Sequence, residues 1–279
     1  MFTRVATGLV LAPILVWLLL YGPKVATFAL LIAATGLCVD ELLRMSAEIR
    51  LRDRLLAAAM AMGLAATPLL GMDSLWVLLG LTPIVVLSIA LVAPGDVALA
   101  ARRAALSMLA IGYVGVLCAM LIGIFHTSGV PAVTRASIGP YDIGRGALLA
   151  CMGIVFMGDT GAFFAGRSFG RHKLYPLISP KKTIEGAIGG LSASILGGVL
   201  ARWLLLPTLG LAEAMLLGAA LGAVGQIGDL VESLFKRATD TKDSGQLLPG
   251  HGGLLDRLDG VLFAAPLMQA WLVLLARGH

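Results

Sequence analysis

The chain has 279 residues, of which 58% are hydrophobic and only 13% are charged, and its mean hydropathy is +0.94. Soluble domains carry about 25% charged residues, so this composition excludes an ordinary soluble enzyme and indicates a multi-spanning membrane protein. The net charge of +5 is no sign of nucleic acid binding, because the basic residues lie in short connections between apolar segments. We therefore expect no nucleic acid partner. The three cysteines form no CxxC pair, so neither a disulfide framework nor a zinc site is indicated.

Nine apolar segments follow one another along the chain, and we expect each to be a helix because isolated strands cannot satisfy their backbone in lipid. Their approximate ranges are 4–22, 25–40, 55–71, 75–93, 104–125, 146–165, 184–206, 211–231 and 260–276. The first segment resembles a signal peptide, but Lys24 leads straight into another apolar segment without a cleavage site, so we expect an uncleaved span. The predicted fold class is an all-α polytopic integral membrane protein with about nine transmembrane helices.

The basic residues predict the orientation of these helices. Together with Arg4, the connections after the second, fourth, sixth and eighth segments hold 16 of the 21 lysines and arginines. Those in the connections are Arg44, Arg50, Arg52, Arg54, Arg102, Arg103, Arg167, Arg171, Lys173, Lys181, Lys182, Lys236, Arg237, Lys242 and Arg257. The positive-inside rule then predicts a cytoplasmic N-terminus and a C-terminus outside.

The two halves of the sequence differ in kind. Residues 1–145 hold apolar segments with ordinary connections, and we interpret them as a scaffold. Residues 146–279 hold the unusual polar residues in two predicted cytoplasmic loops, and we interpret them as the catalytic region. No convincing internal repeat is found, which weighs against a transporter built from inverted repeats.

One apolar segment ends in a polar stripe. Gln226, Asp229, Ser233 and Lys236 are spaced by three, four and three residues, so they share one face of a helix. A carboxylate at the centre of a span costs about 2.5–3.5 kcal/mol, and less near the interface. Asp229 therefore needs a metal ion, a basic partner or water, and the simplest structural alternative is an ion pair with Lys236.

The following loop gathers groups that suit metal and phosphate binding. Its charged residues, its histidine and its glycine-rich turn comprise Lys242, Asp243, Gly250, His251, Gly252, Gly253, Asp256, Arg257 and Asp259. Carboxylates from several segments suit Mg²⁺, which binds one or two of them together with substrate phosphates. Glycines let backbone N–H groups approach a phosphate closely. The alternative is a solvated loop whose aspartates cap the last helix.

A second polar cluster lies earlier in the chain. Asp159 interrupts an apolar segment, and Lys181 and Lys182 precede the next one. Ser179 or Thr183 is a candidate cap for the helix that follows. Two lysines beside a helix N-terminus make a site for a polyphosphate, whereas the alternative is that they face lipid headgroups and only report topology.

At these residues the sequence resembles the phosphatidate cytidylyltransferase (CDP-diacylglycerol synthase) family, bacterial type. The 27 residues from 233 to 259 match its signature at Ser233-Leu234-Phe235-Lys236-Arg237, Lys242-Asp243, His251-Gly252-Gly253 and Asp256-Arg257-Leu258-Asp259. Further likeness lies in Gly158-Asp159-Thr160-Gly161-Ala162 and in Ser179-Pro180-Lys181-Lys182-Thr183, followed by Glu185-Gly186. Phe163 stands where many members have tyrosine, so no phenol role is carried over.

The resemblance implies a nucleotidyltransferase of phospholipid biosynthesis, which makes CDP-diacylglycerol and diphosphate from CTP and phosphatidate. It also implies Mg²⁺, with a second cation such as K⁺, and a homodimer in the bacterial inner membrane with its active site facing the cytoplasm. The resemblance of the second half thereby adds lipid access and dimer contacts to the scaffold role of residues 1–145. Metal binding is expected at Asp229, Asp256 and Asp259. Catalytic roles are expected at Lys236, Asp243, His251 and Arg257, with a loop-structuring role as the alternative for His251. Substrate contacts are expected at Lys181, Lys182, Ser233, Arg237, Lys242, Gly252 and Gly253.

Three rival functions share some of these features. A CTP-dependent polyprenol or phytol kinase would release a lipid phosphate and CDP instead of a CDP-lipid and diphosphate. An ion-coupled transporter would use Asp159 and Asp229 as intramembrane ion sites, but the polar residues cluster at one face of the membrane. A structural or assembly protein would have no use for the His251-Gly252-Gly253 loop.

Overall fold

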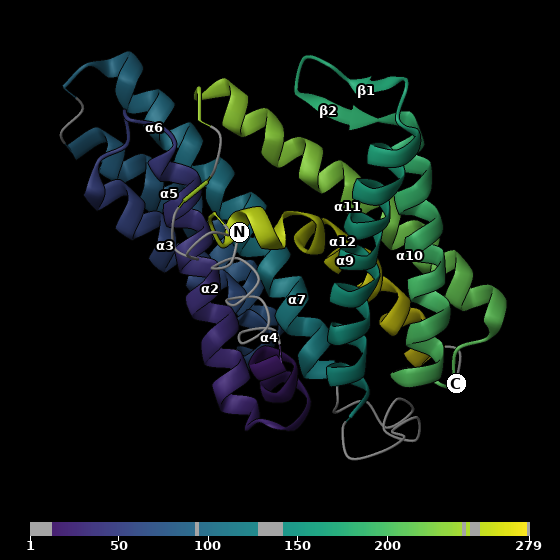
Figure 1. Ribbon diagram of the computed structural model, residues 1–279. Coiled ribbons are helices and arrows are strands. Elements are labelled where there is room, and N and C mark those ends of the chain that lie inside the picture. Colours follow the sequence, from purple (N-terminus) through teal and green to yellow (C-terminus); the bar gives the residue numbers. More distant parts are fainter. Residues whose placement is uncertain (1–12, 93–94, 128–141, 242–243, 246–251, 278–279) are drawn as a thin grey trace.

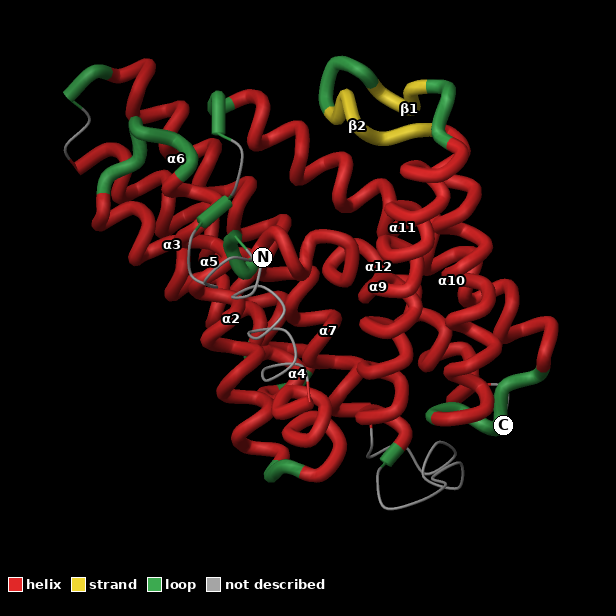
Figure 2. Tube along the Cα trace, in the orientation of Figure 1, coloured by secondary structure: helices red, strands yellow, loops and turns green. Residues whose placement is uncertain are grey.

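The computed structural model describes residues 13–92, 95–127, 142–241, 244–245 and 252–277, and within these ranges helices and one two-stranded sheet are joined by short loops and turns (Figures 1 and 2). Residues 13–21 are helical and lead into α2. The elements that follow are α2 (Lys24–Arg44), α3 (Leu51–Ala65), α4 (Thr67–Leu70), α5 (Met72–Val92), α6 (Val97–Ala110), the π-helical turn η1 (Ile111–Gly115), α7 (Val116–His126), α9 (Ile143–Phe169), β1 (Lys173–Tyr175), β2 (Ser179–Thr183), α10 (Ile184–Leu204), α11 (Leu211–Ala238) and α12 (Leu255–Arg277).

Seven helical stretches within the described residues are long and apolar enough to cross a membrane. They are Lys24–Arg44, Asp73–Val92, Val97–His126, Ile143–Phe169, Ile184–Leu204, Leu211–Ala238 and Leu255–Leu275. Each corresponds to one of the apolar segments of the sequence, so the prediction of an all-α polytopic membrane protein is confirmed.

Two of the nine predicted segments remain outside this set. Residues 4–12 of the segment 4–22 lie outside the described residues, and residues 13–21 are helical. The segment 55–71 forms α3 and the short α4, which begins with Pro68 in its first turn. Because α3 has 15 residues, it is about 22 Å long, which is shorter than the roughly 30 Å hydrocarbon core. The total number of spans therefore stays a prediction.

The polar connections meet at one end of the helix bundle. The β1–β2 hairpin joins α9 to α10 and lies at the top of Figure 1, whereas α4 and the C-terminus lie towards the opposite end. Arg237 Nε, near the end of α11, donates a hydrogen bond of 3.3 Å to the carbonyl of Ile178 in the hairpin. The backbone N–H of Leu255 at the start of α12 donates to Glu41 near the end of α2. The connections predicted to face the cytoplasm after the sixth and eighth segments thus share one end.

The last helix, α12, is the centre of the bundle. Val261, Ala264, Ala265 and Met268 are fully buried among side chains of α7, α9, α10 and α11. Leu262, on another face of α12, is fully buried in a second cluster that includes side chains of α2, α3 and α6. Because α12 belongs to both clusters, it joins the N-terminal helices to the polar helices of the second half. The proposed division of roles between residues 1–145 and 146–279 stays a prediction.

Helices α10 and α11 pack with their backbones in close contact. A Cβ atom on Gly198 would lie 2.2 Å from the carbonyl oxygen of Ala214 and 3.1 Å from the Cα of Gly218. Small residues at such interfaces are typical of membrane helices, where close van der Waals packing replaces the hydrophobic effect as the driving force. This contact holds the N-terminal part of α11 against α10.

The β1–β2 hairpin was not anticipated from the sequence. It is antiparallel, with Lys173 opposite Thr183 and Tyr175 opposite Ser179. Its second strand carries Lys181 and Lys182 and runs directly into α10. The predicted polyphosphate-binding lysines are therefore presented on a strand and not on a loop.

We expect the two ends of the bundle to react with impermeant reagents from opposite sides of the membrane. Native Cys38, Cys118 and Cys151 are all buried, so they contribute a low background. Leu177→Cys, in the exposed hairpin turn, should react with a membrane-impermeant maleimide from the cytoplasmic side of oriented vesicles. Thr208→Cys, in the exposed α10–α11 connection, should react only from the other side. Labelling of both from one side would contradict the arrangement.

The close contact at Gly198 and the open space at Gly153 predict different effects for two glycine substitutions. Gly198→Ala should lower the free energy of unfolding by about 1–3 kcal/mol, because its Cβ meets backbone atoms that cannot move independently. Gly153→Ala in α9 has nothing within 4 Å of its Cβ, so it should be neutral or stabilise by up to about 1 kcal/mol through helix propensity. The midpoint of thermal unfolding in detergent, detected by fluorescence size-exclusion chromatography, compares the two variants. Equal midpoints for the two variants would contradict the close contact.

Candidate active site

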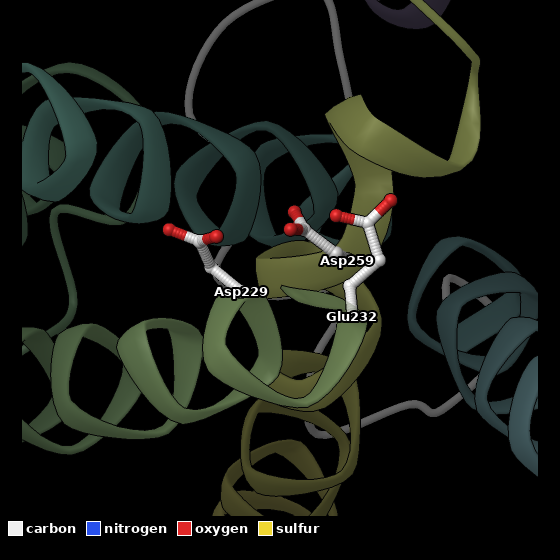
Figure 3. A group of neighbouring side chains, drawn as sticks. All are labelled: Asp229, Glu232 and Asp259. Atoms are coloured by element: carbon white, nitrogen blue, oxygen red, sulfur yellow. The ribbon is translucent and has the colours of Figure 1, made fainter. Parts of the chain in front are cut away.

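Three carboxylates meet where the polar end of α11 touches the start of α12 (Figure 3). Asp229 and Glu232 come from α11 and Asp259 comes from α12. One oxygen of each lies within 4.8 Å of one oxygen of each of the others. Glu232 is 1% exposed and Asp259 is 7% exposed, whereas Asp229 is half-buried. We call Asp229, Glu232 and Asp259 the carboxylate cluster.

The cluster forms because the sequence lets α11 and α12 approach closely. Asp229 and Glu232 are three residues apart and so face the same side of α11. Between α11 and α12 stands Gly228, whose Cβ would lie 2.6 Å from the carbonyl oxygen of Asp259 and 2.9 Å from the Cβ of Phe263. Any larger residue there would push α12 outward and carry Asp259 away from the other two carboxylates.

Two lysines from different elements offset the negative charge. Lys182 on β2 lies 2.6 Å from Asp229 between Nζ and Oδ2. Lys236 on α11 lies 2.6 Å from Glu232 Oε2 and 2.8 Å from Asp256 Oδ1. The simple alternative that Asp229 pairs with Lys236 is wrong. The two residues are seven positions apart, which is about 10 Å along the helix. Asp229 pairs instead with Lys182 of the hairpin.

The donor set of the carboxylate cluster fits a hard divalent cation. Mg²⁺ prefers oxygen ligands and is usually held by one or two carboxylates. Within the described residues, Glu232 Oε1 is buried without a hydrogen-bond partner. Such an orphaned buried oxygen costs free energy unless a donor or a cation satisfies it. Asp229, Glu232 and Asp259 are therefore the described residues that could hold Mg²⁺.

Asp256, the third predicted metal ligand, stands beside this cluster with its oxygens already engaged. It accepts hydrogen bonds from the backbone N–H of Gly253 at 2.8 Å and of Ser244 at 3.1 Å, besides the contact with Lys236. Asp256 thus organises the turn that starts α12, and its metal role stays a prediction.

A cavity of about 460 Å³ opens next to the carboxylate cluster. Its lining comes from α9, the hairpin, α10 and α11 and comprises Asp159, Ala162, Phe163, Gly166, Arg167, Leu174, Lys181, Lys182, Thr183, Gly186, Ala187, Gln226 and Asp229. Ligand pockets have volumes of about 300–1,000 Å³, so the cavity has the size of a small-molecule site. Arg167, Lys181 and Lys182 supply positive charge, and Phe163 and Leu174 supply apolar surface.

Local hydrogen bonds hold the hairpin over this cavity. Thr183 caps α10, as predicted, because its hydroxyl accepts from the backbone N–H of Gly186 at 3.1 Å. Glu185, in the first turn of α10, accepts from the backbone N–H groups of Arg171 and His172 and lies 2.6 Å from His172 Nδ1. These contacts fix the strand from which Lys182 reaches Asp229. Ser179, the other candidate cap, lies in β2.

The remaining predicted site residues are distributed around this centre. Ser233 is buried on α11, and Arg237 contacts the hairpin carbonyl of Ile178. Gly252 has φ of +80°, a backbone conformation that favours glycine, and Gly253 is buried. Arg257 is exposed on the first turn of α12. Four predicted site residues lie outside the described residues, so their roles are untested: Lys242, Asp243, Gly250 and His251.

Sequence reasoning missed two carboxylates. Glu232 lies between Asp229 and Ser233 of the predicted polar stripe, and its spacing of three residues from Asp229 was the signal that could have assigned it to the same face. Glu41 lies far away in sequence but contacts the turn before α12. The signal for Glu41 was weaker. A carboxylate at the end of an apolar segment is costly unless a hydrogen-bond donor or a cation satisfies it.

The profile of the cytidylyltransferase family matches residues 2–275 of the chain. Among curated proteins, the chain is 48% identical over 120 residues to a phosphatidate cytidylyltransferase of Staphylococcus haemolyticus. It is 49% identical over 122 residues to a phosphatidate cytidylyltransferase of Staphylococcus aureus. In both comparisons the matched stretch covers 43% of this chain and 46% of the relative. The chain thus spans about half the length of the curated relatives it matches.

The carboxylate cluster predicts one divalent cation site that depends on Glu232. Glu232→Gln should weaken binding of Mn²⁺, used as a paramagnetic probe for Mg²⁺, by about 10-fold or more, because a buried carboxylate ligand is replaced by a neutral amide. Glu48→Gln changes an exposed carboxylate that pairs with Arg102 and serves as the matched control. Electron paramagnetic resonance of free Mn²⁺ measures both affinities, and equal values would rule out this cluster as the site.

Proposed function

Because the chain belongs to the cytidylyltransferase family, we propose that it is a phosphatidate cytidylyltransferase, which converts CTP and phosphatidate into CDP-diacylglycerol and diphosphate. The observation that carries this proposal is the junction of the carboxylate cluster with a cavity whose cationic side chains are Arg167, Lys181 and Lys182. Carboxylates that can bind a metal and cations that can bind phosphates are the two groups that nucleotidyl transfer requires. Their position at one end of a membrane-spanning bundle supports a lipid as the second substrate.

The cavity suggests how the two substrates are arranged. The triphosphate of CTP would lie near Lys181 and Lys182, beside Asp229. The acyl chains of phosphatidate would stay in the bilayer while its headgroup enters sideways between helices. Phe163, which is 59% exposed, lines the cavity and is apolar enough to face the lipid during this entry. This arrangement explains why an enzyme that uses a soluble nucleotide is embedded in a membrane.

The chemistry needs charge compensation more than proton transfer. A phosphate oxygen of phosphatidate attacks the α-phosphorus of CTP, and diphosphate leaves with the bond electrons. A phosphomonoester loses its second proton near pH 6, so the attacking oxygen is already largely ionised and no strong general base is needed. Two unit charges about 4 Å apart repel by about 4 kcal/mol at an effective dielectric of 20. A bound Mg²⁺ would supply positive charge that offsets this repulsion and stabilises the transferring group.

The protein's own residues then orient the substrates. Lys182 exchanges its contact with Asp229 for a phosphate oxygen when the nucleotide enters, since both lie at the wall of the cavity. Lys236 keeps Glu232 and Asp256 in place through its two ion pairs. We assign Arg257, on the first turn of α12, to the leaving diphosphate. We also assign catalytic roles to His251 and Asp243, as the family resemblance implies.

The cellular setting follows from the same proposal. CTP is a cytoplasmic nucleotide, so the end of the bundle that carries the hairpin faces the cytoplasm, in agreement with the distribution of basic residues. The resemblance to bacterial members supports the inner membrane as the location, a homodimer as the assembly, and K⁺ as a second cation.

The proposed reaction predicts which phosphate of CTP enters the lipid. With Mg²⁺ and phosphatidate in mixed micelles, label from α-³²P-CTP should appear in the lipid phase, whereas label from γ-³²P-CTP should appear in diphosphate. EDTA should abolish the transfer. With phytol or a polyprenol in place of phosphatidate, lipid labelled from the γ-position would instead identify a CTP-dependent lipid kinase. No labelled lipid from phosphatidate would reject the proposed transferase, and no labelled lipid from the alcohols would reject the kinase.

Asp229→Asn should reduce this transfer by about 100-fold or more, because it removes a charged ligand and the partner of Lys182 at the reacting centre. Asp73→Asn, an exposed residue in the first turn of α5, is the control and should keep full turnover. Both variants should elute as folded protein from size-exclusion chromatography. Undiminished transfer by Asp229→Asn would contradict its assignment.

A further inference from the structure

A buried carboxylate of the N-terminal half contacts the segment that starts α12. Glu41, near the end of α2, is 6% exposed. Its carboxylate accepts hydrogen bonds from the backbone N–H of Leu254 at 3.1 Å and of Leu255 at 2.9 Å. The hydroxyl of Ser244 donates a third, longer contact of 3.4 Å. More than 200 residues separate Glu41 from each of these donors.

These hydrogen bonds satisfy backbone N–H groups that have no acceptor within the helix. The first N–H groups of any helix have no partner within it, and α12 begins at Leu255. A carboxylate at this end accepts those hydrogen bonds and interacts favourably with the helix dipole. Most helices obtain such a cap from the preceding residues, whereas α12 obtains part of it from α2.

The segment held by Glu41 also holds the acidic residues of the site. Asp256 is the residue after Leu255 and closes the turn by accepting from the N–H of Gly253. Asp259 lies about one helical turn further on, where it joins the carboxylate cluster. A shift or rotation of the first turn of α12 therefore moves both carboxylates relative to α11.

The glycines of this segment pack directly on Glu41. A Cβ on Gly245 would lie 2.6 Å from Glu41 Oε1, and a Cβ on Gly253 would lie 2.7 Å from Glu41 Oε2 and 2.1 Å from Ser244 Oγ. Neither position has space for a side chain while Glu41 keeps its hydrogen bonds. The fit of glycines on both sides of one carboxylate indicates a contact that constrains the segment closely.

We propose that Glu41 is a positioning residue that fixes the first turn of α12 and thereby sets the place of Asp256 and Asp259 in the active site. Its effect on turnover rests on the proposed function, whereas its effect on the segment does not. Loss of this contact should lower kcat, because the carboxylates are misplaced. It should change KM for CTP little, because Lys181 and Lys182 are held by the hairpin and not by α2.

Hydrogen–deuterium exchange of the full-length protein in detergent tests the contact without reference to activity. In Glu41→Gln, amides of the peptide 252–260 should exchange about 10-fold faster than in the wild type, because a charged acceptor of backbone N–H groups is replaced by a neutral one. Asp40→Asn is the matched control: its carboxylate is adjacent on α2 but pairs with Arg44 and Arg54. It should leave both exchange and kcat unchanged.

A second variant approaches the same contact from the other side. Gly245→Ala should also speed exchange of the peptide 252–260, and the double variant with Glu41→Gln should be no faster than the faster single one, because both disrupt one interaction. Wild-type exchange in Glu41→Gln and Gly245→Ala, or equal acceleration in Asp40→Asn, would overturn the proposal. If the wild type forms no CDP-lipid, the proposed function fails, while the exchange result still decides the role of Glu41.

Discussion

The contact of α11 with α12 at Gly228 is the constraint on which the site depends. It brings Asp229, Glu232 and Asp259 within reach of one another at the end of a bundle that spans an apolar medium. Charges that are close together and poorly solvated repel strongly. Cations must therefore lie beside them, which accounts for Lys236 one turn further along α11 and for a hairpin that carries Lys182 over the cavity.

The same constraint explains the central place of α12. Its apolar faces are buried in both hydrophobic clusters, so its position is set by the helices of each half. Its first turn is set by polar contacts with Glu41, Ser244 and the N–H of Gly253. Apolar packing thus fixes where the helix lies, and hydrogen bonds fix how its acidic end is turned. A site made of short carboxylates tolerates little error in either.

Patterns that depend on neighbours along one helix were predictable. The apolar segments, the stripe of Asp229 and Lys236, and the capping role of Thr183 follow from length, periodicity and cap chemistry. Contacts between different elements could not be predicted in this way. The pairing of Lys182 with Asp229, the reach of Glu41 to Leu255 and the short hairpin depend on how helices pack, and periodicity identifies the face of a helix without identifying what it meets. The shortness of α3 also escaped prediction, because Pro68 lies within a continuous apolar run.

The contact between Glu41 and the segment before α12 bears on how such a chain can change during evolution. Glu41 lies in the first half of the sequence, and the glycines that accommodate it, Gly245 and Gly253, lie near the end. A recombinant that took its N-terminal helices from one ancestor and its acidic helix from another would combine a carboxylate and a glycine turn of different origin. Where the two ancestors differ at these positions, such an exchange would keep every residue of the carboxylate cluster and still lose the hydrogen bonds that hold the start of α12, so Glu41 and the two glycines are expected to change together.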